Sequence, residues 1–300
     1  MSTCTIMKYY GSKRRMISVI RSCLPHDYKV WVEGCMGSGA VSLNRDCPST
    51  CKVNIINEKG RGMYRFWKTL ADKEKGVELM ELLKSCEDNR HTFYEACWNI
   101  RYTPKTMSEA EYAMYVYLSV ALSFNGDRKN YSNEKRKKDF GRMVENHMRP
   151  AYERFQNEQT KVLNWDVVDL MEKIVGLSEK VQKDIMVYLD PPYMPNVRSE
   201  NALKIYENEM SVDDHLKLLE LLKRAKCKVL LSGYLHEGMD TYCEWLIPHG
   251  YQCYFAGEYE RSCSVVKIDK GIEYLWCNYE LPKGAQVELY PYQSKVIWTP

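Results

Sequence analysis

Residues 29–43, with the sequence KVWVEGCMGSGAVSL, contain the pattern that decides the fold class. Their first five residues form a short β-branched and aromatic run, which predicts a strand. Gly34, Gly37 and Gly39 follow, and glycine lets a chain turn tightly or approach a ligand closely because it has no Cβ. An apolar stretch beginning at Ala40 then predicts the start of a helix. This order is typical of the first half of a β-α-β unit.

Further strand-like runs follow along the chain. Residues 52–57 predict a second strand and residues 159–163 a third. Residues 185–189 form a continuous apolar run, as expected of a strand that is covered on both faces. Residues 228–231 predict another strand, and residues 272–277 a late one that could run antiparallel. A helix is predicted between the strands at 185–189 and 228–231, because Ser211 is followed three residues later by Asp214, a typical capping pattern. The alternation predicts an α/β, Rossmann-like fold with a mostly parallel, doubly wound sheet.

The pattern changes after the second predicted strand. Apolar residues between Met63 and Leu70 recur at helical spacing, and residues 112–124 form the longest apolar stretch. A membrane span needs roughly 20 apolar residues, so this stretch predicts a buried core helix. We favour core packing over a base-stacking platform for its tyrosines because the apolar run is continuous. We expect a mainly helical insert at 62–158, between two parts of one domain at 1–61 and 159–300.

Composition excludes several classes of protein. Of the 300 residues, 45% are hydrophobic and 28% charged, which excludes global disorder. The net charge of +3 permits a nucleic-acid partner without arguing for one. The 12 cysteines include no C-x-x-C pair and do not cluster with histidine, so we expect reduced thiols, no metal site and a cytoplasmic location. The first residues show no apolar signal segment, so we expect no secretion.

The glycine-rich turn indicates a ligand site only when a second residue is considered. Its spacing, G-x-x-G-x-G, differs from the dinucleotide pattern, and a purely structural turn would explain it equally well. Glu58, however, lies nineteen residues after Gly39, at the end of the next predicted strand. A carboxylate at that point can accept hydrogen bonds from both hydroxyls of a ribose. The pair favours a nucleoside-type cofactor.

A second candidate site follows the buried strand at 185–189 and consists of Asp190, Pro191, Pro192 and Tyr193. Two prolines remove two backbone donors and fix two φ angles. The carbonyls of Asp190 and Pro191 are then rigid acceptors beside a carboxylate, which suits a donor-rich exocyclic amine. Tyr193 adds a flat face for a base. The alternative is an ordinary proline-rich loop at a strand end.

In these motifs the chain resembles the Dam-like (D12 class) DNA adenine-N6 methyltransferases. The order of the motifs is more specific than any one of them, and enzymes with D-P-P-Y before the glycine loop, or with N-P-P-Y, fit less well. The resemblance covers nearly the whole chain and is carried by the segments 8–13, 33–39, 57–58, 124–126, Arg128, Asp166, 190–193 and 273–279.

The resemblance implies S-adenosyl-L-methionine as methyl donor. It implies that Glu58 holds the ribose of the donor and Asp166 its adenine amine. The full set of implied donor-binding residues is Tyr9, Tyr10, Gly11, Ser12, Lys13, Glu33, Gly34, Gly37, Ser38, Gly39, Ala40, Val41, Glu58, Asp166 and Asp190. Three positions depart from the family pattern: Ser12 replaces a glycine, Gly34-Cys35 replaces Pro-Phe, and Glu58 replaces an aspartate. Each change keeps the expected chemistry.

The resemblance also implies how adenine would react. Asp190 and the Pro191 carbonyl would each accept one N6 hydrogen, which favours a pyramidal nitrogen aimed at the methyl group. Catalysis would then rest on positioning and electrostatics, without a metal. The base must first leave the duplex, at a cost of a few kcal/mol. Stacking on Tyr193 would return about 1–3 kcal/mol of that cost.

Double-stranded DNA is the implied partner, together with a cognate restriction endonuclease. The expected DNA-binding residues lie in the insert, although a solvated charged loop is the alternative there. They are Asn125, Arg128, Lys129, Asn130, Lys135, Arg136, Lys137 and Lys138. Two other functions stay open: adenine-N6 methylation of RNA, and DNA binding by a relative that has lost turnover.

Overall fold

The computed structural model describes most of the chain. The described residues are 3–7, 9, 11–133, 137–194, 209–235, 241–260 and 270–292. Tyr10, Lys135 and Arg136, which the sequence analysis assigned to binding sites, lie outside them, as does the side chain of Asn125.

In the described part of the chain, one eight-stranded sheet forms the centre, with the order β3-β2-β1-β4-β5-β7-β6-β8. The first five strands in this order are parallel, and β7 pairs antiparallel with both β5 and β6. The strands are β1 (Val30–Glu33), β2 (Val53–Asn57), β3 (Thr160–Leu163), β4 (Ile185–Leu189), β5 (Lys228–Tyr234), β6 (Gln252–Glu260), β7 (Lys270–Cys277) and β8 (Glu288–Leu289).

The α/β, mostly parallel fold predicted from the sequence is confirmed. Each strand expected from the sequence is present, and the late strand β7 is antiparallel. β5 continues three residues beyond the expected end at Leu231. β6 and β8 were not predicted: β6 mixes glycine and glutamate into its run, and β8 has only two residues.

Helices cover both faces of the sheet because its central strands bury side chains on both sides. Trp31 of β1 packs with α1 and α2 on one face, whereas Val32 packs with α9, α11 and α12 on the other. This double burial explains the continuous apolar run of β4. The helices are η1 (Lys13–Met16), α1 (Ile17–Cys23), α2 (Ala40–Asn44), α9 (Val167–Val175), α10 (Glu179–Gln182), α11 (Val212–Arg224), α12 (Thr241–Leu246) and η6 (Ile247–His249).

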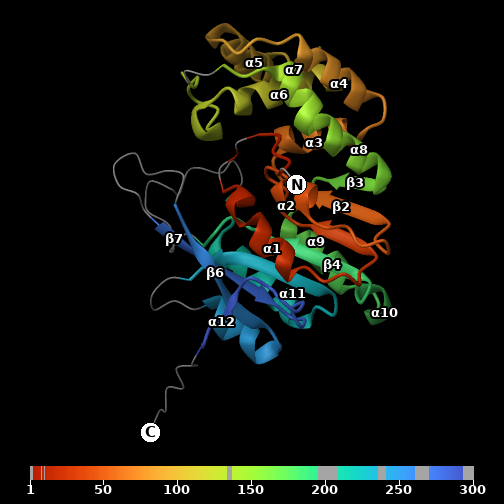
Figure 1. Cartoon of the computed structure of the whole chain (residues 1–300), viewed down its shortest axis with the longest axis vertical. Helices are drawn as coiled ribbons and strands as arrows, with labels where there is room; N and C mark the ends of the chain where they lie inside the picture. Colours follow the sequence, from red (N-terminus) through yellow and green to blue (C-terminus); the bar gives the residue numbers. More distant parts are fainter. Residues whose placement is uncertain are drawn as a thin grey trace.

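Residues between β2 and β3 are helical and gather beyond one edge of the sheet (Figure 1). α6 is buried along most of its length, as its apolar run predicts. Tyr117 is fully packed within it, which supports core packing rather than a stacking platform. The elements are α3 (Arg61–Ala71), α4 (Lys75–Lys84), α5 (Arg90–Tyr102), α6 (Glu109–Ala121), η2 (Phe124–Gly126), α7 (Phe140–Met143), a π-helical turn (Val144–Met148) and α8 (Arg149–Asn157).

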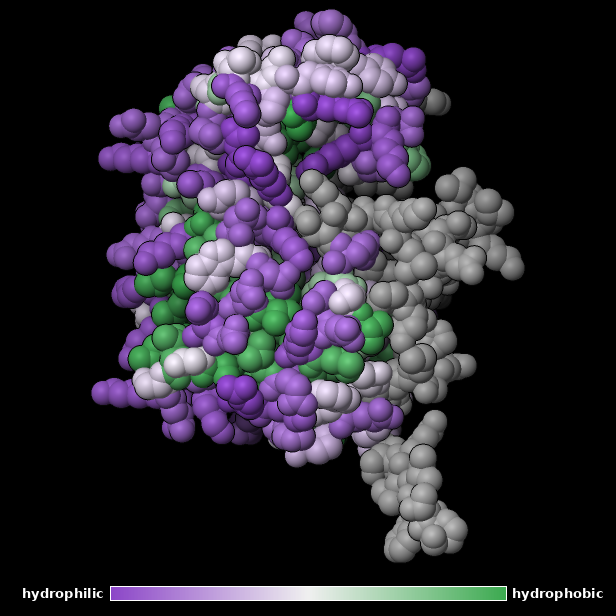
Figure 2. All heavy atoms as spheres, turned by 180° about the vertical axis from the view of Figure 1, so that it is seen from behind, coloured by the Kyte–Doolittle hydropathy of each residue, from purple (hydrophilic) through white to green (hydrophobic). Residues whose placement is uncertain are grey.

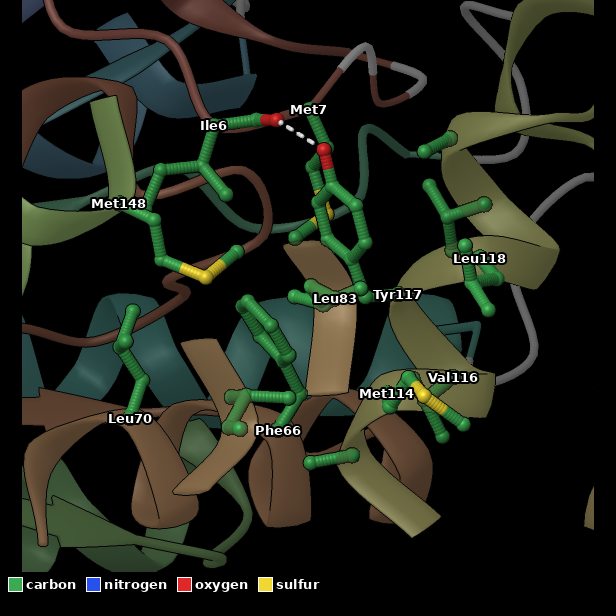
Figure 3. Close-up of a cluster of buried hydrophobic side chains, with 14 of the residues drawn as sticks. Ile6, Met7, Phe66, Leu70, Leu83, Met114, Val116, Tyr117, Leu118 and Met148 are labelled. Atoms are coloured by element: carbon green, nitrogen blue, oxygen red, sulfur yellow. Dashed lines mark hydrogen bonds between the residues drawn. The ribbon is translucent and has the colours of Figure 1, made fainter. Parts of the chain in front are cut away.

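The start of the chain joins this helical region to the sheet. Ile6 and Met7 are buried in the same core as Tyr117 (Figure 3), and the Tyr117 hydroxyl donates to the Ile6 carbonyl at 3.1 Å. Cys4 exchanges two hydrogen bonds with the Asn44 amide at the end of α2, at 2.6 and 2.8 Å. We call the described residues 3–7, 9 and 11–14 the N-terminal segment. Its position depends on both parts of the molecule.

The surface differs between the two parts. On the back face, hydrophilic side chains cover much of the helical region, and apolar side chains gather below it over the α/β part (Figure 2). Among the described residues, no helix is long and apolar enough to cross a bilayer.

The Tyr117 hydrogen bond gives a stability prediction. Tyr117→Phe leaves the buried Ile6 carbonyl without this donor, so the free energy of unfolding should fall by roughly 1–3 kcal/mol in urea titrations. Tyr94→Phe is the matched control because Tyr94, on α5, is half exposed. Equal losses in the two variants would contradict the assigned anchoring of the N-terminal segment.

Candidate active site

The main cavity lies at the carboxyl ends of the parallel strands. It is lined by the turns that follow β1, β2, β3 and β4, together with Tyr9, Gly11, Ser12 and Lys13 of the N-terminal segment. The strand order reverses between β1 and β4, so the turns after these strands diverge to opposite faces and leave a crevice. In a doubly wound sheet this is where a ligand binds.

The glycine turn after β1 has a conformation that needs its glycines. Gly37 and Gly39 have φ of 49° and 70°, in the left-handed region. A Cβ on Gly39 would lie 2.6 Å from the Met36 methyl and 3.0 Å from the Trp67 ring. The Trp67 indole also donates to the Gly37 carbonyl at 3.1 Å. The turn is therefore a rigid element whose backbone forms one wall of the cavity.

Glu58 holds this turn in place. Its two carboxylate oxygens accept from the backbone N–H of Gly37 at 2.9 Å and of Gly60 at 2.8 Å. The side chain is buried and lines the cavity at the end of β2. The predicted ligand residue thus also joins the turns after β1 and β2.

Glu33 lies at the base of the same turn. Its carboxylate accepts from the Ser42 N–H at 2.8 Å and so caps the first turn of α2. Burial raises the pKa of Glu33 to about 8, although the Ser42 hydrogen bond opposes the shift. The resemblance implies that Glu33 binds the donor, which stays a prediction, whereas the structure gives it this capping role.

Asp166 closes the cavity at the start of α9. One carboxylate oxygen accepts from the Val168 N–H at 2.9 Å, and the other lies 2.5 Å from the Lys59 ammonium. Asn57 connects the turns after three strands, because its side-chain amide donates to the carbonyls of Gly34 and Trp165. These contacts bring the predicted residues from distant segments into one wall.

Asp190 forms a buried ion pair with Lys13. The Lys13 ammonium, whose side chain is only 6% exposed, lies 2.7 Å from Asp190 Oδ1. The Ser232 hydroxyl, on β5, donates to the same oxygen at 3.1 Å. Neither contact uses Oδ2. Pro191, Pro192 and Tyr193 continue the cavity wall beside it, as the sequence predicts.

Glu273 on β7 completes this cluster. Both of its oxygens accept from the Tyr193 hydroxyl, at 3.0 and 3.1 Å, and one lies 3.9 Å from the Lys13 ammonium. Burial, aided by the negative charge of Asp190, raises the pKa of Glu273. Burial alone would lower the pKa of Lys13, but the two carboxylates outweigh it and raise that pKa. Lys13 therefore stays charged at neutral pH.

The other described residues of the N-terminal segment that were predicted to bind the donor also lie at the cavity. Ser12, where the family pattern has glycine, shares a 2.8 Å hydrogen bond with Ser38 of the glycine turn. The Tyr9 ring lies over Gly37, within 3.6 Å of where a Cβ would stand. Gly11 turns the chain with a φ of 74°. The unusual serine thus binds the segment to the turn.

None of the described residues that were predicted to bind DNA lines this cavity. The N–H groups of Lys129 and Asn130 donate to the Asp127 carboxylate, which shapes a tight turn. The ammonium groups of Lys137 and Lys138 lie 3.8 and 3.9 Å from the Asp88 carboxylate. Asp88 therefore offsets part of the positive charge that the sequence places here.

Sequence reasoning missed several residues of the cluster. Glu273 was quoted for the family resemblance but not assigned to the site, although an acid in an apolar strand is a signal of a buried partner. Ser232 and Lys59 carry no comparable signal, since a serine in a strand or a lysine in a turn is common. The position of Ser232 depends on the pairing of β5 with β4 and β7, which are far apart in the sequence, and Lys59 reaches Asp166 from the turn after β2.

The shifted pKa of Glu33 predicts a pH effect on stability. Between about pH 4.5 and 8 the folded state keeps a proton that the unfolded state has lost, so stability should fall as pH rises through this window. Glu33→Gln keeps an oxygen acceptor for Ser42 without the charge and should lose most of this dependence. Urea unfolding at about pH 5 and about pH 8 measures it. A slope unchanged from that of wild type would contradict the shift.

Glu273 gives a second prediction. Glu273→Gln leaves one acceptor for the Tyr193 hydroxyl, so the ring is held less firmly in the cavity wall. The rate constant of the methyl transfer that the resemblance implies should fall between about tenfold and a hundredfold, with little change in affinity for the implied donor. Glu280→Gln, at an exposed position after β7, is the control. Equal rates in both variants would show that Glu273 does not position Tyr193.

Comparisons with known proteins agree with this geometry. Residues 9–244 match the family of D12 class N6 adenine-specific DNA methyltransferases, which favours DNA over the RNA alternative. The Type II methyltransferase M1.LlaDCHI of Lactococcus lactis subsp. cremoris is 25% identical over 242 residues, which make up 75% of this chain and 79% of that protein. The chain belongs to the D12 class of N6 adenine-specific DNA methyltransferases and is an enzyme that methylates adenine in DNA.

Proposed function

We propose that the main cavity binds S-adenosyl-L-methionine beside a flipped-out target adenine, and that residues 190–193 grip the amino group of that base. The observation that carries the proposal is the buried Lys13–Asp190 pair at the end of β4, next to the glycine turn after β1. The donor and acceptor sites would then share one crevice.

The residues of the cavity fit the proposed donor. Its walls combine an aromatic ring, backbone groups of a glycine turn, and the carboxylates of Glu58 and Asp166. Carboxylates suit ribose hydroxyls and an adenine amine, and the ring of Tyr9 suits a flat base. The donor supplies an electrophilic methyl group on a sulfonium. Tyr10 and the remaining donor-binding residues predicted from the sequence belong to the same proposal.

The residues at the end of β4 would prepare the amine for attack. Lys13 and Ser232 hold Oδ1 of Asp190, which leaves Oδ2 to accept one N6 hydrogen. The Pro191 carbonyl would accept the other, since the prolines provide no competing backbone donors. These acceptors also stabilise the positive charge that develops on nitrogen as it is alkylated.

The charge of Lys13 decides the role of its neighbours. A lysine that stays protonated at neutral pH cannot serve as a general base. Its ammonium instead holds Asp190 in place and offsets the repulsion between Asp190 and Glu273. Asp190, already hydrogen-bonded to N6, is then the group placed to receive a proton once the nitrogen is methylated.

Tyr193 would support the flipped base. Its hydroxyl is fixed by Glu273, and its ring centre lies 4.2 Å from that of Tyr234. A ring held in this way can stack with a base at little cost in entropy. Stacking of about 1–3 kcal/mol would offset part of the cost of base flipping.

The helical insert, at 62–158 in this proposal, would recognise double-stranded DNA. The candidates are Asn125, Arg128, Lys129, Asn130, Lys135, Arg136, Lys137 and Lys138, which combine phosphate-binding cations with amides that can read base edges. A cognate restriction endonuclease and a cytoplasmic location complete the proposal.

The function is tested by expressing the chain in a host that lacks DNA methylation and sequencing the genomic DNA by a single-molecule method. We expect N6-methyladenine in one sequence context. Asp190→Ala should abolish the mark while purified protein still binds labelled S-adenosyl-L-methionine. Asp190→Asn preserves the side-chain shape and should also be inactive. Full methylation by either variant would contradict the role of Asp190.

A further inference from the structure

A second hollow is lined in part by other residues of the N-terminal segment. It is enclosed by residues 3–7 and Arg14 on one side and by residues 137–147 of the helical region on the other. We call it the N-terminal groove. Its polar lining residues include Thr5, Arg14, Lys138, Arg142, Asn146 and His147.

The charge of this groove is strongly positive. Arg14, Lys137, Lys138 and Arg142 line it, and Asp139 is the single carboxylate among the described lining residues. Asp139 already caps α7, since its Oδ1 accepts from the Arg142 N–H at 2.8 Å. Asp88 offsets part of the charge of the two lysines, but not that of Arg14 or Arg142. The lining therefore suits a polyanion.

Two polar atoms in the same lining lack a hydrogen-bond partner. The Thr5 hydroxyl and Nδ1 of His147 are buried without one. Such atoms cost free energy unless a ligand completes them. His147 lies on the π-helical turn, a distortion that is frequent at functional sites. Both atoms can donate to an anionic oxygen.

We propose that the N-terminal groove binds a backbone phosphate of the DNA substrate, with Arg14 supplying the charge and Thr5 and His147 supplying hydrogen bonds. The inference rests on the proposed function, because it assumes that DNA reaches the main cavity. It adds a contact outside the residues predicted to bind DNA.

The position of the groove gives this contact a consequence for the active site. Lys13 pairs with Asp190 in the main cavity, whereas the next residue, Arg14, lines the groove. Described residues of the N-terminal segment thus line both hollows. A phosphate bound by Arg14 would hold the segment that carries Lys13, so DNA engagement would favour the assembled site.

The salt dependence of DNA binding tests the charge. Fluorescence anisotropy with a duplex that carries the methylated sequence gives the affinity at several salt concentrations. Arg14→Gln should reduce the slope of log affinity against log salt by about one, because one phosphate contact is lost. Arg21→Gln is the control, since Arg21 forms a surface ion pair with Asp46. Slopes that are equal for Arg14→Gln and wild type would overturn the proposal.

Thr5→Val separates a binding role from a structural one. Valine removes a hydroxyl that has no partner in the free protein, so stability should stay equal or rise. Affinity for the duplex should nevertheless fall by about tenfold. Reduced stability with unchanged affinity would mean that the hydroxyl serves the fold alone, and would overturn the proposal.

A neutral phosphate analogue locates the contact. Each duplex of a series carries one methylphosphonate, at a different backbone position. Wild-type protein should bind one of them more weakly than the rest, the one modified at the contacted phosphate near the target. Arg14→Gln has already lost that contact, so its affinity should show no further decrease with that duplex. Additive losses at every position would overturn the proposal. Methyl transfer by wild-type protein is measured in parallel, so that failure of the groove is distinguished from failure of the proposed function.

Discussion

The buried ion pair between Lys13 and Asp190 is the constraint on which the rest of the site depends. Removing one partner from such a pair leaves an uncompensated charge in a poorly solvated place, which is far more costly than losing a surface contact. The assembled site therefore requires Lys13 to lie at the end of β4 beside Asp190. Hydrogen bonds from Cys4 to Asn44 and from Tyr117 to Ile6 fix the residues that precede Lys13 and so help to place it there.

The acidic side chains of the cavity have structural roles, and the proposed function adds chemical ones. Glu58 connects two turns, Glu33 caps α2, and Asp166 caps α9 while pairing with Lys59. Each is held by backbone N–H groups, so its position is set before any ligand arrives. This preorganisation is what a reaction that relies on positioning requires.

The sequence predicted most of the fold because its strands have strong local patterns. The run at 185–189 and the glycine turn after residue 33 identify the two strands at the centre of the sheet. The boundaries of β5 and the existence of β6 could not be predicted, because their pairing with β7 depends on residues far away in the chain. The same limit applies to the site. Asp190 and Lys13 lie in motifs that were assigned to the site. Glu273 lies in a segment that carries the resemblance, but its place beside Asp190, like that of Ser232, comes from strand pairing.

The most direct measurement is a structure of the protein with S-adenosyl-L-homocysteine and a duplex that carries its recognition sequence. The account predicts that N6 of an extruded adenine lies within hydrogen-bond distance of Asp190 and the Pro191 carbonyl, with Lys13 still paired to Asp190. An adenine that remains stacked in the duplex, or an amino group that faces away from Asp190, would contradict it.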